Sequence, residues 1–280
     1  MEEISSRAAE PTSPSPDGGD EPLFRRDGDV YVPHERTRGP WSEDAQHGGA
    51  VASLVAALVE ARDRVRDIQV VRITYELLRP VPLRPLRVTL RPGDSGRSVD
   101  RVDVEVRPID DDQPVVLARA LRMRRKPVSL PALASDDPPP APEDCPPIVM
   151  SIFPWTSLVS HGVEMRLAGG SAFLEPGPAA VWFRLRQPVV EGLPLTPLQR
   201  VCLVADFGNG TSNVAPLLSF LYVNADLTVA VHREAQGEWI GLDSVSRLGD
   251  RGIGLTSSRI LDRAGSVGHA TQSLLVAART

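Results

Sequence analysis

Three polar residues in the second half of the chain stand out because each lies in an otherwise apolar stretch. Asp206 ends an apolar run at the end of a predicted helix, Asn224 interrupts a long strand pattern, and Gln272 lies in the last strand pattern. A carboxylate and two amides can bind and activate a water molecule, since the carboxylate accepts protons and the amides donate and accept hydrogen bonds. The same side chains could instead only tie a sheet together.

The first half of the chain predicts one helix and an antiparallel sheet. Asp27-Gly28 lies between short apolar runs, which is typical of a hairpin. From Ala50 to about Val65 apolar residues recur at helical spacing, and small residues would let this helix lie very close to a sheet. Period-two alternation predicts strands with one buried face at Val71–Leu77, Leu86–Leu90, Val102–Val106 and Val115–Met123.

The second half repeats this order of elements. Thr196-Pro197 is a good N-cap and first-turn pair for a helix from Leu198 to about Phe207. Gly208 and Gly210 are predicted to end that helix. Strands are predicted at Val163–Leu167, Val181–Leu185, Ser219–Arg233, Trp239–Ser246, Gly254–Asp262 and Val267–Arg279.

The alternation also predicts where the two amides point. Gln272 shares a face with Ala270 and Leu274, so it points to the apolar side, where an unpaired amide would cost about 1–3 kcal/mol. It must therefore have partners there. Asn224 shares parity with Asp226, and a strand without a bulge would place it on the more polar side.

Four regions follow from this pattern. Residues 1–21 are predicted to be a disordered tail, 22–126 a first domain, 127–150 a Pro-rich linker and 151–280 a second domain. A sheet that wraps one helix leaves an edge, and pairing two such units edge to edge gives a continuous sheet. We expect the two domains to pair in this way within one chain, and association with a second chain stays open.

Composition argues against several classes of function. The formal charge of -5 gives no electrostatic reason to expect nucleic acid, and Lys126 is the only lysine. The two cysteines, Cys145 and Cys202, fit a cytoplasmic chain with reduced thiols. No apolar run approaches the roughly 20 residues of a membrane span, and the polar, acidic N-terminus is unlike a signal peptide.

Several motifs resemble those of the double hotdog acyl-CoA thioesterases, and of the acyl-CoA thioesterase II group in particular. The likeness covers roughly residues 22 to 279 and is carried by Gly39-Pro40-Trp41 with Gln46-His47-Gly48-Gly49, Asn224-Ala225-Asp226-Leu227 with Val231-His232-Arg233, and Ala270-Thr271-Gln272-Ser273. It implies an α+β fold in which two antiparallel sheets, each wrapping one helix, join into a continuous sheet. It also implies an acyl-CoA substrate and no cofactor or metal.

The resemblance assigns a water-holding role to Asp206, Asn224 and Gln272, with Asn224 standing where the best-known members have Thr. It further implies that a helix N-terminus meets the thioester carbonyl. We therefore expect His47, Gly48 and Gly49 to contribute to substrate binding and to face Asp206 across the domain interface. The two glycines would let the backbone approach a ligand closely.

Thioester hydrolysis then needs a nucleophile. No Gly-x-Ser-x-Gly motif occurs, and the five histidines show no metal-ligand spacing. Water with Asp206 as general base is left, and burial is predicted to raise the pKa of Asp206 above its ordinary value of about 3.9.

Other interpretations stay open. Asp206 and His47 could be capping or packing residues, Asn224 a strand-end or bulge residue, and Gln272 a structural amide. His232-Arg233 could be either a CoA-phosphate contact or a solvated strand end. A hotdog module that only binds an acyl ligand is the first rival function. A dehydratase or hydratase is the second, but it would need a His/Asp pair, and the sequence shows none at convincing positions.

Overall fold

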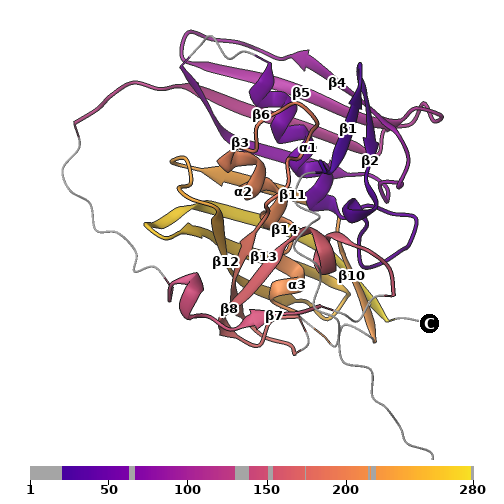
Figure 1. The fold of residues 1–280 in the computed structure, drawn as a ribbon, viewed down its shortest axis with the longest axis vertical. Coiled ribbons are helices and arrows are strands. Elements are labelled where there is room, and N and C mark those ends of the chain that lie inside the picture. Colours follow the sequence, from indigo (N-terminus) through magenta and orange to yellow (C-terminus); the bar gives the residue numbers. More distant parts are fainter. Residues whose placement is uncertain are drawn as a thin grey trace, which may run out of the picture.

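The computed structural model describes residues 21–62, 67–129, 139–150, 154–173, 175–213, 215 and 219–278. The predicted disordered tail, apart from Glu21, and the middle of the predicted linker lie outside these residues. The described strands form one antiparallel sheet, in the order β1-β2-β4-β5-β6-β3-β11-β14-β13-β12-β9-β8-β7, with β10 also paired to β14. Figure 1 shows the first half above the second, with the sheet running through both.

The first half contains the predicted hairpin, helix and four strands. Gly28 has a φ of +62°, which suits the tight turn between the first two strands. Alternating burial in the later strands agrees with their period-two pattern. The elements are β1 (Phe24–Asp27), β2 (Val30–Pro33), α1 (Gly48–Ala61), β3 (Ile68–Leu77), β4 (Leu86–Pro92), β5 (Val99–Pro108) and β6 (Val116–Arg124).

The second half follows the same plan. The Thr196 hydroxyl accepts a hydrogen bond from the Gln199 N–H and so caps α2, as predicted. The elements are β7 (Pro147–Ile148), β8 (Glu164–Gly170), β9 (Ala179–Arg184), α2 (Pro197–Ala205), α3 (Gly208–Thr211), β10 (Phe220–Asn224), β11 (Asp226–Val231), β12 (Trp239–Leu248), β13 (Ile253–Asp262) and β14 (Gly265–Ala278).

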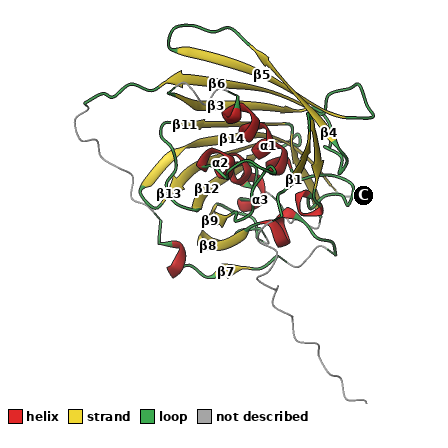
Figure 2. Ribbon diagram, turned by 45° about the horizontal axis from the view of Figure 1, so that its top comes forward, coloured by secondary structure: helices red, strands yellow, loops and turns green. Residues whose placement is uncertain are grey.

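The two halves join where β3 pairs with β11, from Asp226 opposite Glu76 to Ala230 opposite Arg72. This confirms the expected continuous sheet. Both long helices lie on the same side of the sheet and pack against each other (Figure 2). A Cβ on Gly49 would overlap the Leu203 carbonyl oxygen, so the small residues of α1 serve a close approach to α2 as well as to the sheet.

Two predictions about the second half are wrong. Gly208 and Gly210 do not end the helix that carries Asp206, because α2 ends at Ala205 and the glycines lie in the short helix α3. The predicted single strand Ser219–Arg233 is divided at Ala225 into β10 and β11. Both pair with β14, and β11 also pairs with β3.

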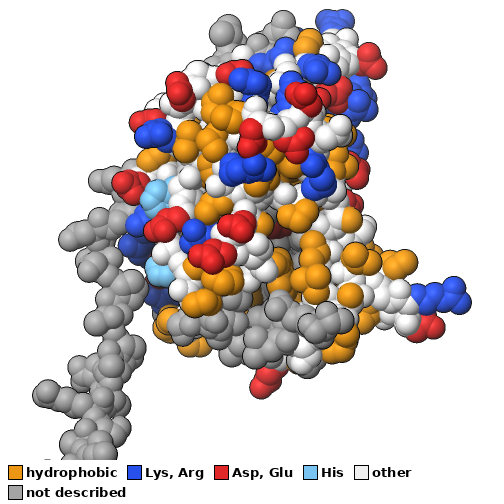
Figure 3. Space-filling view, turned by 90° about the vertical axis from the view of Figure 1, so that its right-hand side faces the viewer, with side chains coloured by type: hydrophobic (Ala, Val, Ile, Leu, Met, Phe, Trp, Pro, Cys, Tyr) orange, Lys and Arg blue, Asp and Glu red, His pale blue; other side chains and the backbone are white. Residues whose placement is uncertain are grey.

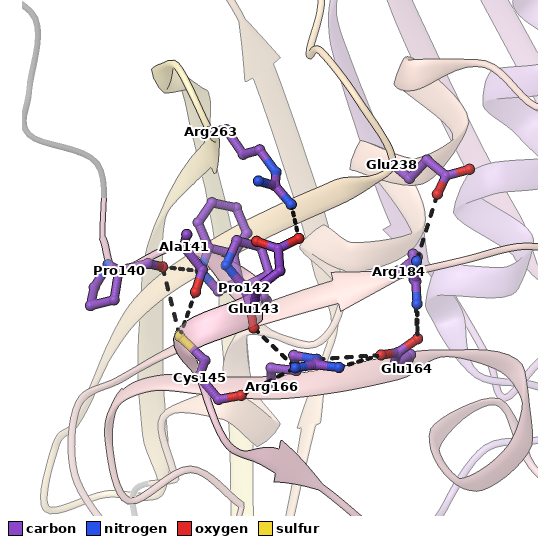
Figure 4. A network of polar contacts seen from close by, with 11 residues as sticks. Pro140, Ala141, Pro142, Glu143, Cys145, Glu164, Arg166, Arg184, Glu238 and Arg263 are labelled. Atoms are coloured by element: carbon purple, nitrogen blue, oxygen red, sulfur yellow. Dashed lines mark hydrogen bonds and ion pairs between the residues drawn. The ribbon is translucent and has the colours of Figure 1, made fainter.

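The described end of the predicted linker is part of the second half. The Trp182 indole N–H donates to the Pro140 carbonyl at 2.8 Å, and Arg263 forms an ion pair with Glu143 (Figure 4). Residues Pro147–Ile148 then pair with β8 as strand β7. These contacts favour a second domain that begins before residue 151.

The surface differs between the halves. On the face shown in Figure 3, charged side chains of both signs crowd the upper part, and hydrophobic side chains gather lower down and to the right. By register, exposed aliphatic side chains are neighbours on β10, β14 and β13, namely Leu221, Val223, Leu275, Ile253 and Leu255. Among the described helices, none combines the length and the hydropathy that crossing a membrane would require.

Candidate active site

Asp206 lies where the end of α2 meets the beginning of α1. Its side chain is only 5% exposed. The Gly49 N–H donates to Oδ2 at 2.7 Å, which confirms that the N-terminus of α1 faces Asp206 across the two halves. A helix dipole disfavours a carboxylate at its own C-terminus and favours one at an N-terminus. The first half therefore supplies the electrostatic environment that this carboxylate needs.

His47 completes the contact between the two helices. Its Nδ1 lies 2.9 Å from the Asp206 Oδ2 and 3.0 Å from the Gly49 nitrogen. A bare Nδ1 lone pair could accept from Gly49, but it would then face a carboxylate lone pair. We therefore assign a proton to Nδ1, which donates to Asp206, while the Gly49 N–H also donates to Asp206. The His47 ring stacks on Phe207 with 4.4 Å between ring centroids, which fixes its orientation.

Asn224 contacts Asp206 because the strand is irregular beside it. Its Nδ2 donates to the Asp206 Oδ1 at 2.9 Å. A β-bulge at Ala225 reverses the alternation of side chains, so that Asn224 points to the helix side of the sheet. The polar side is expected only for a strand without a bulge, whereas Asn224 ends β10 beside a bulge, which agrees with its interpretation as a strand-end or bulge residue.

Gln272 points to the inner face of the last strand, as its parity predicts, and is 1% exposed. Its Nε2 donates to the Asp206 carbonyl at 3.1 Å and lies 3.4 Å from the Asp206 Oδ1. Its Oε1 accepts from the Asn209 N–H at 3.0 Å. A Cβ on Gly208 would lie 2.6 Å from this Oε1, so glycine is needed there. The amide thus has the partners that its burial demands.

The surroundings of Asp206 lower the pKa of its carboxyl group. Burial is the largest influence and alone would raise this pKa. The charge of His47 and the hydrogen bonds from His47, Asn224 and Gly49 outweigh burial, so the pKa falls below its ordinary value. The predicted rise is wrong because burial was considered without the donors that the first half supplies. Asp206 is therefore an anion at neutral pH.

Two family models match the chain. The acyl-CoA thioesterase N-terminal domain matches residues 37–123, and the acyl-CoA thioesterase C-terminal domain matches residues 136–276. The second match alone spans half of the chain. The chain belongs to the acyl-CoA thioesterase family.

Solved structures resemble this family member over most of its length. A candidate thioesterase from Novosphingobium aromaticivorans is 24% identical, with a TM-score of 0.66 over 91% of this chain and 98% of that chain. An acyl-CoA thioesterase II from Mycobacterium marinum is 19% identical, with a TM-score of 0.64 over 92% and 96%. A hot dog fold protein from Alicyclobacillus acidocaldarius is 17% identical, with a TM-score of 0.65 over 92% and 96%. These matches confirm the double hotdog fold. Curated protein sequences give no match.

Gly48 brings the backbone of α1 directly against the carboxylate. Gly48 is half-buried, whereas its neighbours His47 and Gly49 are buried. A Cβ built on Gly48 would lie 2.8 Å and 3.0 Å from the two carboxylate oxygens of Asp206. Glycine at this position therefore allows a close approach that a side chain would prevent.

Other residues singled out by the sequence have different roles. The Arg233 guanidinium binds Asp262 through two nitrogens, one of them at 2.7 Å. Because Asp262 already neutralises this guanidinium, Arg233 does not suit the CoA-phosphate contact. Burial raises the pKa of the Cys202 thiol to about 12, as suits an inert core thiol. Within the described part of the chain, no group of three or more His, Cys, Asp or Glu side chains has a metal-binding arrangement.

Sequence reasoning missed one member of the site, Asn209. Its backbone N–H holds the Gln272 amide, and its side-chain amide donates to the Tyr222 carbonyl at 3.4 Å. The available signal was the run Gly208-Asn209-Gly210, which predicts a helix end. Gly208 allows α3 to lie close to β14, because a larger residue at 208 would overlap Gln272.

Proposed function

We propose that this protein hydrolyses an acyl-CoA thioester to a free acid and CoA by attack of an activated water. The observation that carries the proposal is the convergence of α2, β10, β14 and the N-terminus of α1 on one buried carboxylate. Membership of the acyl-CoA thioesterase family supports acyl-CoA as the substrate class.

The attacking water is best held by the Asp206 oxygen that has fewer donors. Oδ2 already accepts two close donors, from Gly49 and His47. Oδ1 accepts one close donor from Asn224 and a 3.4 Å contact from Gln272, so it keeps the greater capacity to accept a proton.

In the reaction that follows, Asp206 takes a proton from the water while the water oxygen attacks the thioester carbonyl carbon. The tetrahedral intermediate collapses, the C–S bond breaks, and the proton passes to the CoA sulfur. The products are a free acid and a CoA thiol, and Asp206 is again a carboxylate. Because its pKa is lowered, Asp206 is a weak base, and orientation and electrostatics must supply most of the acceleration.

The intermediate also needs a donor for its oxyanion. The Gly49 N–H is taken by Asp206. Among the described residues, the Gly48 N–H in the first turn of α1 donates no hydrogen bond. We assign the oxyanion role to Gly48, and Gly49 then holds the carboxylate.

A second candidate function is hydration of an enoyl-CoA, which the His47–Asp206 pair favours. Sequence reasoning found no such pair, and the structure brings these two side chains to 2.9 Å. A hydratase would use the imidazole to take a proton from water. Here Nδ1 faces the carboxylate and the ring is stacked on Phe207, an arrangement that orients Asp206. Hydrolysis is therefore the better-supported function.

Thiol release from acyl-CoAs of short, medium, long and branched chains tests the proposal, with hydration of matching enoyl-CoAs measured in parallel. We expect thiol release by the wild type, reduced about tenfold in Gln272→Ala by loss of one positioning hydrogen bond. Hydration without thiol release would favour the second candidate. Tight acyl-CoA binding without either reaction would favour a binding module.

A further inference from the structure

The bulge beside Asn224 is closed by a side chain from the outer face of the sheet. Asn224 pairs with Leu274, whereas Thr228 pairs with Thr271. The chain therefore advances four residues from Asn224 to Thr228 while β14 advances three. Two residues, Ala225 and Asp226, therefore face the single residue Ser273. The Ala225 N–H donates to the Ser273 carbonyl at 3.0 Å, and the Ser273 N–H donates to the Asp226 Oδ1 at 2.6 Å.

The carboxylate of Asp226 thus takes the place of a backbone acceptor. In a regular ladder the Ser273 N–H would bond to a carbonyl of the neighbouring strand. The Ala225 carbonyl instead accepts from the Leu77 N–H of β3 at 2.8 Å. Without Asp226, the Ser273 N–H would lose its partner in the bulge, and a register without the extra residue would become more favourable.

The bulge decides which face Asn224 occupies. Tyr222 before it and Leu227 after it are both buried, although their numbers differ in parity. Leu221 and Val223 point outward and are 36% and 37% exposed. A strand continued from β11 in regular alternation would place Asn224 on the outer face and remove its amide from Asp206.

We propose that Asp226 is a positioning residue that keeps Asn224 directed at Asp206. Its side chain fixes the bulge through Ser273, and its backbone carbonyl accepts from the Asn224 Nδ2 at 3.2 Å. Asp226 also lies directly opposite Glu76 of β3. Two like charges at opposed positions destabilise a strand pair. The bond to Ser273 offsets that repulsion. This inference rests on the proposed hydrolysis, because its kinetic effect acts through Asn224.

A double-mutant cycle on kcat tests the inference with Asn224→Ala, Asp226→Ala and the double variant. We expect each single change to lower kcat about tenfold with a smaller effect on KM. The double variant should be no slower than Asn224→Ala, because Asp226 acts only through that amide. Asp226→Asn keeps a side-chain oxygen as acceptor and should restore kcat to within about twofold of the wild type.

The matched control is Asp243→Ala, which removes an outer-face carboxylate whose partner is Arg259 on the neighbouring strand; its kcat should stay at the wild-type value. If Asp226→Ala does not fold, Asp226→Val gives the same loss of acceptor with a side chain favoured in strands. Wild-type kcat in a folded Asp226→Ala, or additive losses in the double variant, would overturn the inference.

The structure of Asp226→Ala separates this inference from the proposed function. We expect its Asn224 side chain to turn to the outer face of the sheet, and an Asn224 still bonded to Asp206 would overturn the positioning role. If the wild type releases thiol from no acyl-CoA, the proposed hydrolysis fails, and this structural result still decides the role of Asp226.

Discussion

The antiparallel helix pair α1 and α2 has two ends, and their chemistry differs. At one end the N-terminus of α1 meets a carboxylate from the end of α2, and the Gly49 N–H binds Asp206. At the other end the Thr196 hydroxyl caps α2 and donates to Glu60 of α1 at 2.6 Å. Pro197 occupies the first turn there and has no N–H to offer. The carboxylate of Glu60 at that end accepts from a hydroxyl group.

The open space lies at the end without the buried carboxylate. A cavity of about 220 Å³ is lined there by polar and apolar residues, among them Glu60. Its three arginines are already engaged, since Arg233 binds Asp262, Arg122 binds Asp100 and Arg125 binds Glu234. The candidate site is therefore marked by a buried carboxylate at a helix N-terminus, and the size of a cavity is the weaker indication.

Asp206→Asn is the sharpest way to test the difference between the two ends. The variant keeps the size of the side chain but removes its negative charge and its capacity to accept a proton. We expect kcat for thiol release to fall about 10³-fold, within the range for loss of a general base. Glu60→Gln is the matched control at the opposite end and should change kcat by less than about twofold. Equal losses in both variants would contradict the assignment of the site to one end.

Gly48→Ala tests the close approach of α1 to the carboxylate. The new methyl group would lie 2.8 Å and 3.0 Å from the Asp206 oxygens, which is too close, so the carboxylate would have to move. We expect kcat to fall about 100-fold, the loss typical of a misplaced group. Pro197→Ala alters the same position of the other helix and should leave kcat unchanged. A fully active Gly48→Ala variant would show that catalysis does not depend on this position of the carboxylate.

Much of the fold could be predicted because its signals are local. Alternating residues predicted the strands, Asp27-Gly28 the first hairpin, and Thr196-Pro197 the beginning of α2. Each of these depends on residues within a few positions of one another. The inward direction of Gln272 also followed from local parity and is confirmed by its burial.

The remaining features depend on distant partners. The direction of Asn224 depends on Asp226 meeting Ser273, which lies 47 residues away in sequence. The pKa of Asp206 depends on donors from α1, of which Gly49 is 157 residues away. No local pattern reports these pairings. The errors about the pKa of Asp206 and about the His/Asp pair therefore share one physical origin.

His47→Gln tests how the first half controls the charge of Asp206. The pKa of Asp206 is lowered in the folded protein, so its ionisation stabilises the fold above the ordinary carboxyl range, and this contribution is lost as pH falls through the lowered pKa. Glutamine can still donate a hydrogen bond but removes the charge of His47, while burial still raises the pKa. We expect the acid limb of kcat/KM and the acid unfolding transition both to move to higher pH. Unchanged limbs would show that the charge of His47 has no influence.

Asn224→Thr should have the smallest effect, and it tests whether a hydroxyl can replace the amide beside Asp206. Threonine stands at the matching position in the best-known members that the sequence resembles, and its hydroxyl can donate to the Asp206 Oδ1 as the amide does. Threonine is shorter, and it is favoured in strands. We expect kcat to stay within about threefold of the wild type, compared with about tenfold for Asn224→Ala. If Asn224→Thr loses as much kcat as Asn224→Ala, the threonine hydroxyl is too short to reach Asp206 from the backbone position that the bulge sets. The side chain at 224 and the bulge at Ala225 would then depend on each other.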